Sequence, residues 1–129
     1  MSTYYFARTL DESVASAIER VTAALKEEGF GILTEIDVQA TMKKKLDVDL
    51  PPYMILGACN PHFAYQALQL ENKIGTMLPC NVIVRTTEEG KTEVAAVDPM
   101  ASMQAVKNDA LGAVAMDVRN RLRRVIEGL

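Results

Sequence analysis

The middle of the chain reads Tyr53-Met54-Ile55-Leu56-Gly57-Ala58-Cys59-Asn60-Pro61. Its first seven residues are apolar at almost every position, which is typical of a central strand covered on both faces. Asn is a preferred helix N-cap and Pro a preferred first helical residue, so Asn60-Pro61 predicts a helix that runs to about Leu70. This strand-to-helix junction predicts a sheet with helices packed against it.

Upstream of this stretch, the sequence alternates strand and helix patterns. Residues 3–8 and 30–36 are short and rich in β-formers, so each is predicted to be a strand. Between them, four apolar residues recur at helical spacing and predict a helix that ends at Gly29: Val14, Ile18, Val21 and Leu25. Thr9 and Glu12 have the spacing of a capping box before that helix. Asp37 is expected to cap a second helix over residues 38–46.

Downstream, two β-branched runs at 80–87 and 92–97 flank Glu88-Glu89-Gly90, which predicts a hairpin. A long helical pattern then covers most of residues 100–127, with room for a break near 104–108. The element order is β-α-β-α-β-α-β-β-α. It predicts one α+β domain over residues 1–129, with helices packed over a mixed sheet.

Composition limits the class of protein. The chain has 129 residues and a formal charge of −3, with a pI near 5.2, which argues against a nucleic-acid binder. No apolar run approaches the roughly 20 residues that span a bilayer, so no membrane partner is expected. The N-terminus lacks the pattern of a secretory signal. Two cysteines in such a chain are expected to be reduced thiols, and the predicted location is cytoplasmic.

The two cysteines are the first candidates for chemistry. Cys59 precedes a helix N-terminus, where unsatisfied amide groups and the helix dipole lower a thiol pKa. If the strands around Cys59 and Cys80 are antiparallel neighbours, the two thiols lie close together. Packing as small apolar side chains is the competing interpretation, because unpaired cysteine is among the most buried residue types.

Other candidate chemistry is weaker. Cys59, His62 and Cys80 form a candidate metal set, although no C-x-x-C or H-x-x-H pair supports it. The chain contains neither a phosphate-binding glycine loop nor a G-x-S-x-G elbow. The run Lys43-Lys44-Lys45 is expected to be a solvated helix face, with an anion-attracting patch as the minority interpretation.

Three blocks of the sequence resemble a known family. They are Gly29 to Leu46, Ile55 to Pro61, and Leu78 to Val84. In this order they closely resemble the prokaryotic family called domain of unknown function 302. The resemblance implies a TT1751-like α+β fold, a curved and mainly antiparallel sheet with helices against it, and a homodimer. Seven polar or thiol-bearing residues match the family pattern and are carried over as candidate ligand-binding residues: Glu35, Asp37, Lys44, Cys59, Asn60, Cys80 and Asn81. His62 departs from that pattern.

These observations lead to three hypotheses. The first is a non-enzymatic module that binds a small-molecule ligand or a protein partner near the Cys59-Asn60 and Cys80-Asn81 loops. The second is a thiol-based redox or sulfur-carrier protein that uses Cys59 and Cys80. The third is a structural homodimer. The family brings no established reaction or cofactor, and the sequence assigns none.

Overall fold

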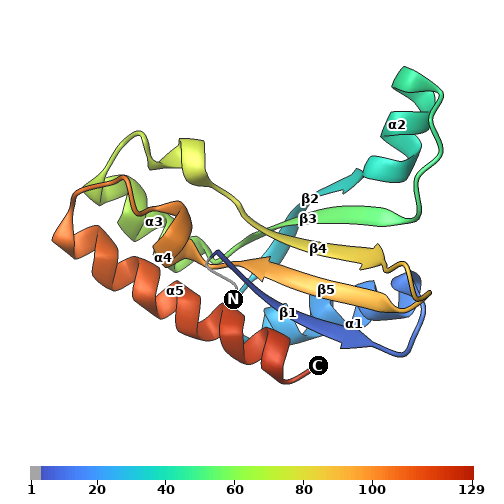
Figure 1. Cartoon of the computed structure of the whole chain (residues 1–129). Helices are drawn as coiled ribbons and strands as arrows, with labels where there is room; N and C mark the ends of the chain where they lie inside the picture. Colours follow the sequence, from blue (N-terminus) through green and yellow to red (C-terminus); the bar gives the residue numbers. More distant parts are fainter. Residues whose placement is uncertain (1–3) are drawn as a thin grey trace.

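The computed structural model describes residues 4–129, which form one five-stranded sheet and the helices around it (Figure 1). Along the chain the elements are β1 (Tyr5–Leu10), α1 (Val14–Glu27), β2 (Gly31–Asp37), α2 (Val38–Leu46), β3 (Tyr53–Cys59), α3 (Pro61–Leu70), the 3-10 helix η1 (Ile74–Met77), β4 (Cys80–Thr86), β5 (Thr92–Val97), α4 (Pro99–Ser102) and α5 (Asp109–Glu127). The strand order is β1-β5-β4-β3-β2.

Every neighbouring strand pair of the sheet is antiparallel. The prediction of an α+β fold with a curved, mainly antiparallel sheet is therefore confirmed, whereas the expectation of a mixed sheet is wrong. Helical connections between strands often produce parallel pairs. Here the strands that such helices connect either are not neighbours in the sheet or run antiparallel to each other. Helix α1 connects β1 to β2, which are the two edge strands of the sheet.

Helices α1 and α5 cover one face of the sheet, and the main core lies beneath them. Alternate residues of each strand point to that face, because the side-chain period of a strand is two. The fully buried members of the core from β3, β4 and β5 are Leu56, Val82, Val84 and Val94. They pack with Val21 and Leu25 of α1 and Leu122 of α5. The sheet is therefore built around one covered face.

The capping of α1 differs from the prediction. Ser13 is the N-cap, and its side chain accepts a hydrogen bond from the Ser16 amide at 3.1 Å. Glu12 instead accepts hydrogen bonds from the Ser16 hydroxyl and from the Arg20 guanidinium. Thr9 stays within β1 because its strand runs on to Leu10. The helix ends as expected, before Gly29 with a positive φ of 88°.

The end of β2, helix α2 and the segment that returns to β3 project from the rest of the molecule (Figure 1). We call residues 33–50 the arm. Asp37 caps α2 by accepting a hydrogen bond from the Ala40 amide at 2.9 Å, as predicted, and no residue of α2 is buried. Lys43, Lys44 and Lys45 are exposed, as expected for a solvated face.

The long helical pattern near the C-terminus is divided, as its break near residues 104–108 predicted. Asp98 caps the short helix α4, and Asn108 caps α5 by accepting a hydrogen bond from the Leu111 amide. Within residues 4–129, no helix combines the length and the apolar character that a membrane span requires.

Candidate functional site

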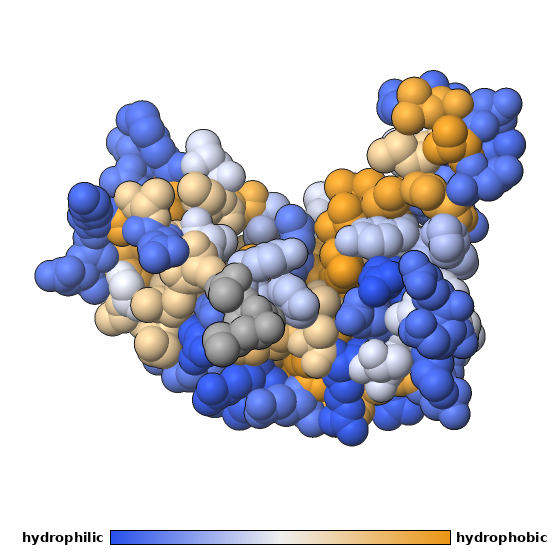
Figure 2. All heavy atoms as spheres, viewed as in Figure 1, coloured by the Kyte–Doolittle hydropathy of each residue, from blue (hydrophilic) through white to orange (hydrophobic). Residues whose placement is uncertain are grey.

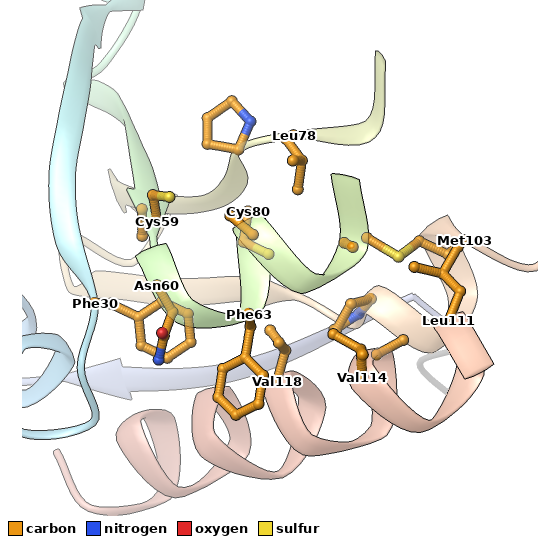
Figure 3. Close-up of a pocket in the computed structure, with 16 residues that line it drawn as sticks. Phe30, Cys59, Asn60, Phe63, Leu78, Cys80, Met103, Leu111, Val114 and Val118 are labelled. Carbon is orange, nitrogen blue, oxygen red and sulfur yellow. The ribbon is translucent and has the colours of Figure 1, made fainter. Parts of the chain in front are cut away.

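The sheet register places the two cysteines near each other. Ala58 of β3 lies opposite Cys80 of β4, so Cys59 is one position beyond that pair. Cys80 faces the helices, and Cys59, at the last position of β3, borders the same space as Cys80 between α3 and α5 (Figure 3). Both cysteines are free thiols. The predicted proximity is confirmed, because both side chains border one space and Cys59 is close enough to contribute to the raised pKa of Cys80.

Cys80 points into a narrow apolar space between α3 and α5 (Figure 3). Phe63, Leu78, Met103 and Val118 contribute to its walls, and its free volume is about 30 Å³. A water molecule needs roughly 10–15 Å³ of such volume. The space therefore has room for only a molecule of about the size of water, and it is a gap in packing rather than a site for a metabolite.

Burial governs the chemistry of both thiols. It raises the pKa of Cys59, and burial together with the nearby Cys59 raises the pKa of Cys80 from 9.0 to about 11. The sequence predicted the opposite direction, from the helix N-terminus that follows Cys59. That prediction is wrong, because burial in apolar surroundings disfavours the thiolate of Cys59.

Asn60 is buried and has a structural partner. It occupies the N-cap position of α3, but its side-chain amide donates to the Glu28 carbonyl at 3.2 Å instead of capping that helix. The Glu28 carboxylate accepts hydrogen bonds from Arg124 at 3.0 and 3.2 Å, and the hydrogen bond from Arg124 lowers its pKa. Arg121 also donates to the Glu28 carbonyl, at 3.3 Å. Asn60 thus helps to join the end of α1 to the β3–α3 junction and to α5.

The structure does not bring the seven carried-over residues into one site. Glu35, Asp37 and Lys44 lie on the exposed arm, whereas Asn60 and Cys80 lie beneath the sheet. Asn81 belongs to the alternate positions of β4, which face away from the helices. Of the predicted site near the two cysteine loops, the structure brings Cys59, Asn60 and Cys80 together around one narrow space, whereas Asn81 lies on the other face of the sheet.

The candidate metal set is likewise not assembled. His62 is exposed in the first turn of α3, while Cys80 is buried on the helix side of β4. Within the part of the chain that the structure describes, no cluster of three His, Cys, Asp or Glu side chains has the arrangement of a metal site.

The face of the sheet away from α1 and α5 carries a continuous apolar row. Ile36 of β2 lies opposite Ile55 of β3, Ile55 lies opposite Ile83 of β4, and Ile83 lies opposite Ala95 of β5. Ala95 in turn lies opposite Ala7 of β1. The row crosses all five strands. Its side chains are isoleucines on β2, β3 and β4 and the smaller alanines on β5 and β1. Small side chains at one end leave a depression on this face.

A hollow of about 400 Å³ occupies that end of the open face. Ala95, Ile83 and Val97 give it an apolar base, and Tyr5 and Tyr53 give it aromatic groups. Its polar groups are Asn81, Arg85 and Glu93. The Arg85 Nε donates to Glu93 Oε1 at 2.7 Å. Ligand sites of proteins are commonly of about 300–1,000 Å³, apolar and aromatic, with few polar groups.

Most of the residues around this hollow were missed by sequence reasoning; Asn81 was the exception. Arg85 and Glu93 fall in two runs that were interpreted only as strands of a hairpin. Their position eight residues apart across the predicted Glu88-Glu89-Gly90 turn was the available signal, since a hairpin turn fixes which residues oppose each other.

Figure 2 shows that the surface is hollowed between the α3 side of the molecule and the arm. Apolar atoms continue from the β2–β3 part of the sheet onto α2 in that view. Several of the largest exposed apolar side chains belong to the arm: Leu33, Ile36, Leu46, Val48 and Leu50. The open face and the arm together form the main apolar surface of this view.

Comparison with known proteins agrees with this architecture. The model of the family "domain of unknown function DUF302" matches residues 6–129. The chain is similar to the crystal structure of an uncharacterized conserved protein DUF302 from Bacillus stearothermophilus, with 28% sequence identity, a TM-score of 0.90 and coverage of 98% of each chain. No curated protein matches the chain. With a family match over almost its whole length, this chain belongs to the family of domain of unknown function DUF302.

Proposed function

We propose that this protein is a non-enzymatic binding module whose site is the hollow on the open face of the sheet. The observation that carries this proposal is that Tyr5, Tyr53, Ile83 and Ala95 line a depression of about 400 Å³ on a face that α1 and α5 leave uncovered. Apolar surface of this kind gains free energy when a ligand removes it from water. The proposal keeps the binding role expected from the sequence and moves its centre from the cysteine loops to Asn81 and its neighbours on β4 and β5.

The depth of the hollow depends on a small residue. Ala95 is only 9% exposed because it lies at the base, and its neighbours on either side in the row are Ile83 and Ala7. A larger side chain at position 95 would occupy the volume that a ligand needs. The surrounding strands pair through their backbones, so this change acts mainly on the hollow.

A second candidate, a homodimer formed through the arm, is favoured by the exposure of that segment. Helix α2 has nine residues and none is buried, whereas an isolated helix shorter than about 12–15 residues is marginal in water. Leu46 is 66% exposed. Covering this surface with a second copy would supply the packing that α2 lacks.

The charges of the arm support pairing with itself. Glu35 and Asp37 lie on its strand, and Lys44 and Lys45 lie on its helix, where they make no ion pair within residues 4–129. A two-fold interface brings the same patch of both copies together. Such an arrangement lets the acidic strand of one arm approach the basic helix of the other.

The thiol alternative has less support. Cys59 and Cys80 border the same space, but they are free thiols there and form no disulfide. The raised pKa values also keep both groups as thiols rather than nucleophilic thiolates.

The first prediction tests the hollow. In a thermal-shift screen of small aromatic and heteroaromatic metabolites, we expect at least one compound to raise the Tm of the natural chain, and Ala95→Phe to abolish that rise. The Tm of the unliganded variant should change by less than about 5 °C, which corresponds to a cost near 1 kcal/mol. Ala23→Phe, at an exposed position of α1, is the matched control and should keep the full response. A ligand response that survives Ala95→Phe would place the site elsewhere.

The second prediction concerns the arm. Sedimentation velocity should show a dimer of the natural chain, and Leu46→Lys should shift it to the monomer because the change puts a charged group where the interface would bury an apolar side chain. Leu68→Lys, at an exposed position of α3 that is 43% accessible, should leave the dimer intact. A natural chain that sediments as a monomer at all concentrations would contradict the self-association.

The third prediction concerns the thiols. In the Cys59→Ala variant, the remaining Cys80 should react with iodoacetamide at pH 8 far more slowly than a free cysteine, and unfolding in guanidinium should restore the ordinary rate. In the natural chain, the Cys80 thiol loses its proton at a lower pH when the chain is unfolded than when it is folded. The stability linked to Cys80 is therefore present below pH 9.0 and falls as the pH rises toward about 11. Rapid alkylation of the folded chain at pH 7 would instead restore the redox hypothesis.

A further inference from the structure

One wall of the hollow holds a cross-strand ion pair. Arg85 of β4 and Glu93 of β5 are register partners, and Arg85 Nε lies 2.7 Å from Glu93 Oε1. Their side chains are 36% and 24% exposed, respectively. Both side chains belong to the row beside the apolar row of Ile83 and Ala95, and both line the hollow.

This pair leaves hydrogen-bonding capacity toward the hollow. A guanidinium has five N–H donors and no acceptor, and a carboxylate has only acceptors. The contact between the two residues uses Nε and Oε1, and within residues 4–129 neither side chain makes another hydrogen bond. The η nitrogens of Arg85 and Oε2 of Glu93 are therefore available to a ligand. They present donors and an acceptor side by side.

The pair also sets the charge of the site. The other polar side chains of the hollow are the amide of Asn81 and the phenols of Tyr4, Tyr5 and Tyr53. One positive and one negative group thus face the ligand together. An anion is attracted by Arg85 and repelled by Glu93, whereas a cation is attracted by Glu93 and repelled by Arg85. A neutral group with an acceptor and a donor gains a charge-assisted hydrogen bond from each.

The rest of the hollow favours a flat ligand. Tyr5 and Tyr53 supply aromatic surface, and Ile83, Ala95 and Val97 supply an apolar base on a pleated sheet. Aromatic side chains bind planar rings through offset-stacked or edge-to-face contacts. A volume of about 400 Å³ has room for a compound of one or two rings.

We propose that the hollow binds a neutral, planar ring compound that carries a carboxamide or a ring lactam. Its carbonyl oxygen accepts from the η nitrogens of Arg85, and its N–H donates to Oε2 of Glu93. The ring lies on the apolar base between the tyrosines. This inference rests on the proposed binding function and specifies the ligand class of the same hollow.

Three probes of the same shape and different charge test the ligand class. They are benzamide, which is neutral, benzoate, which is an anion, and benzamidine, which is a cation at pH 7. Calorimetric titration of the full chain should give an affinity for benzamide roughly tenfold or more above that for either ion, since each charge-assisted hydrogen bond contributes on that scale.

Substitutions within the pair should reverse this order. Glu93→Gln leaves Arg85 as the only charge, so benzoate should become the preferred probe. Arg85→Gln leaves Glu93 as the only charge, so benzamidine should become preferred. Glu12→Gln is the matched control, because Glu12 forms the same Nε–Oε1 contact of 2.7 Å with Arg20 on α1, outside the hollow. That variant should keep the order of the natural chain.

The outcomes separate this inference from the proposed function. Equal or tighter binding of benzoate or benzamidine to the natural chain overturns the ligand class, and so does an order that neither substitution changes. Failure of all three probes to bind overturns it as well. The proposed function itself fails only when the wider metabolite screen also yields no stabilisation that Ala95→Phe removes.

Discussion

The packing of α1 and α5 on the same face of the sheet is the constraint on which the other features depend. Side chains such as Leu56 and Val82 that point to those helices are fully buried. The alternate positions have no helix above them, yet the row through Ile55 and Ile83 is apolar across the strands. An apolar face that the fold does not cover is expected to meet a ligand or a partner. The hollow and the arm are two parts of that surface.

Much of the fold followed from local signals in the sequence. The bounds predicted for β3, α2, α3 and β5 agree with those observed. At three of these elements the boundary has a clear local cause. Asp37 accepts a hydrogen bond from the first turn of α2, and Pro61 starts α3 where its missing N–H costs nothing. The Glu88-Glu89-Gly90 turn sets the start of β5, with Gly90 at a positive φ of 78°. Such interactions lie within a few residues of each other and leave a recognisable pattern.

The site depends on burial, strand register and contacts between residues far apart in the chain, which local sequence patterns do not reveal. An apolar run such as β3 has the same composition whether its second face packs on a helix or lines an open surface, and this is why coverage on both faces was predicted wrongly. Asn60 was placed correctly at the start of α3, but its amide bonds to Glu28, which is 32 residues away. The base of the hollow combines Ile83 and Ala95, whose pairing follows from the register of the sheet. Burial likewise reversed the pKa shift that local sequence predicted for Cys59.

Methyl NMR of the six isoleucines that lie beyond the first helix tests most directly whether the open face is the binding surface. Ile36, Ile55 and Ile83 lie in the apolar row, whereas Ile74 and Ile126 are buried elsewhere, with exposures of 1% and 2%. When a stabilising ligand is added, we expect the Ile83 methyl resonance to shift most, with smaller shifts at Ile55 and none at Ile74 or Ile126. Shifts confined to Ile74, near the space between α3 and α5, would contradict binding on the open face.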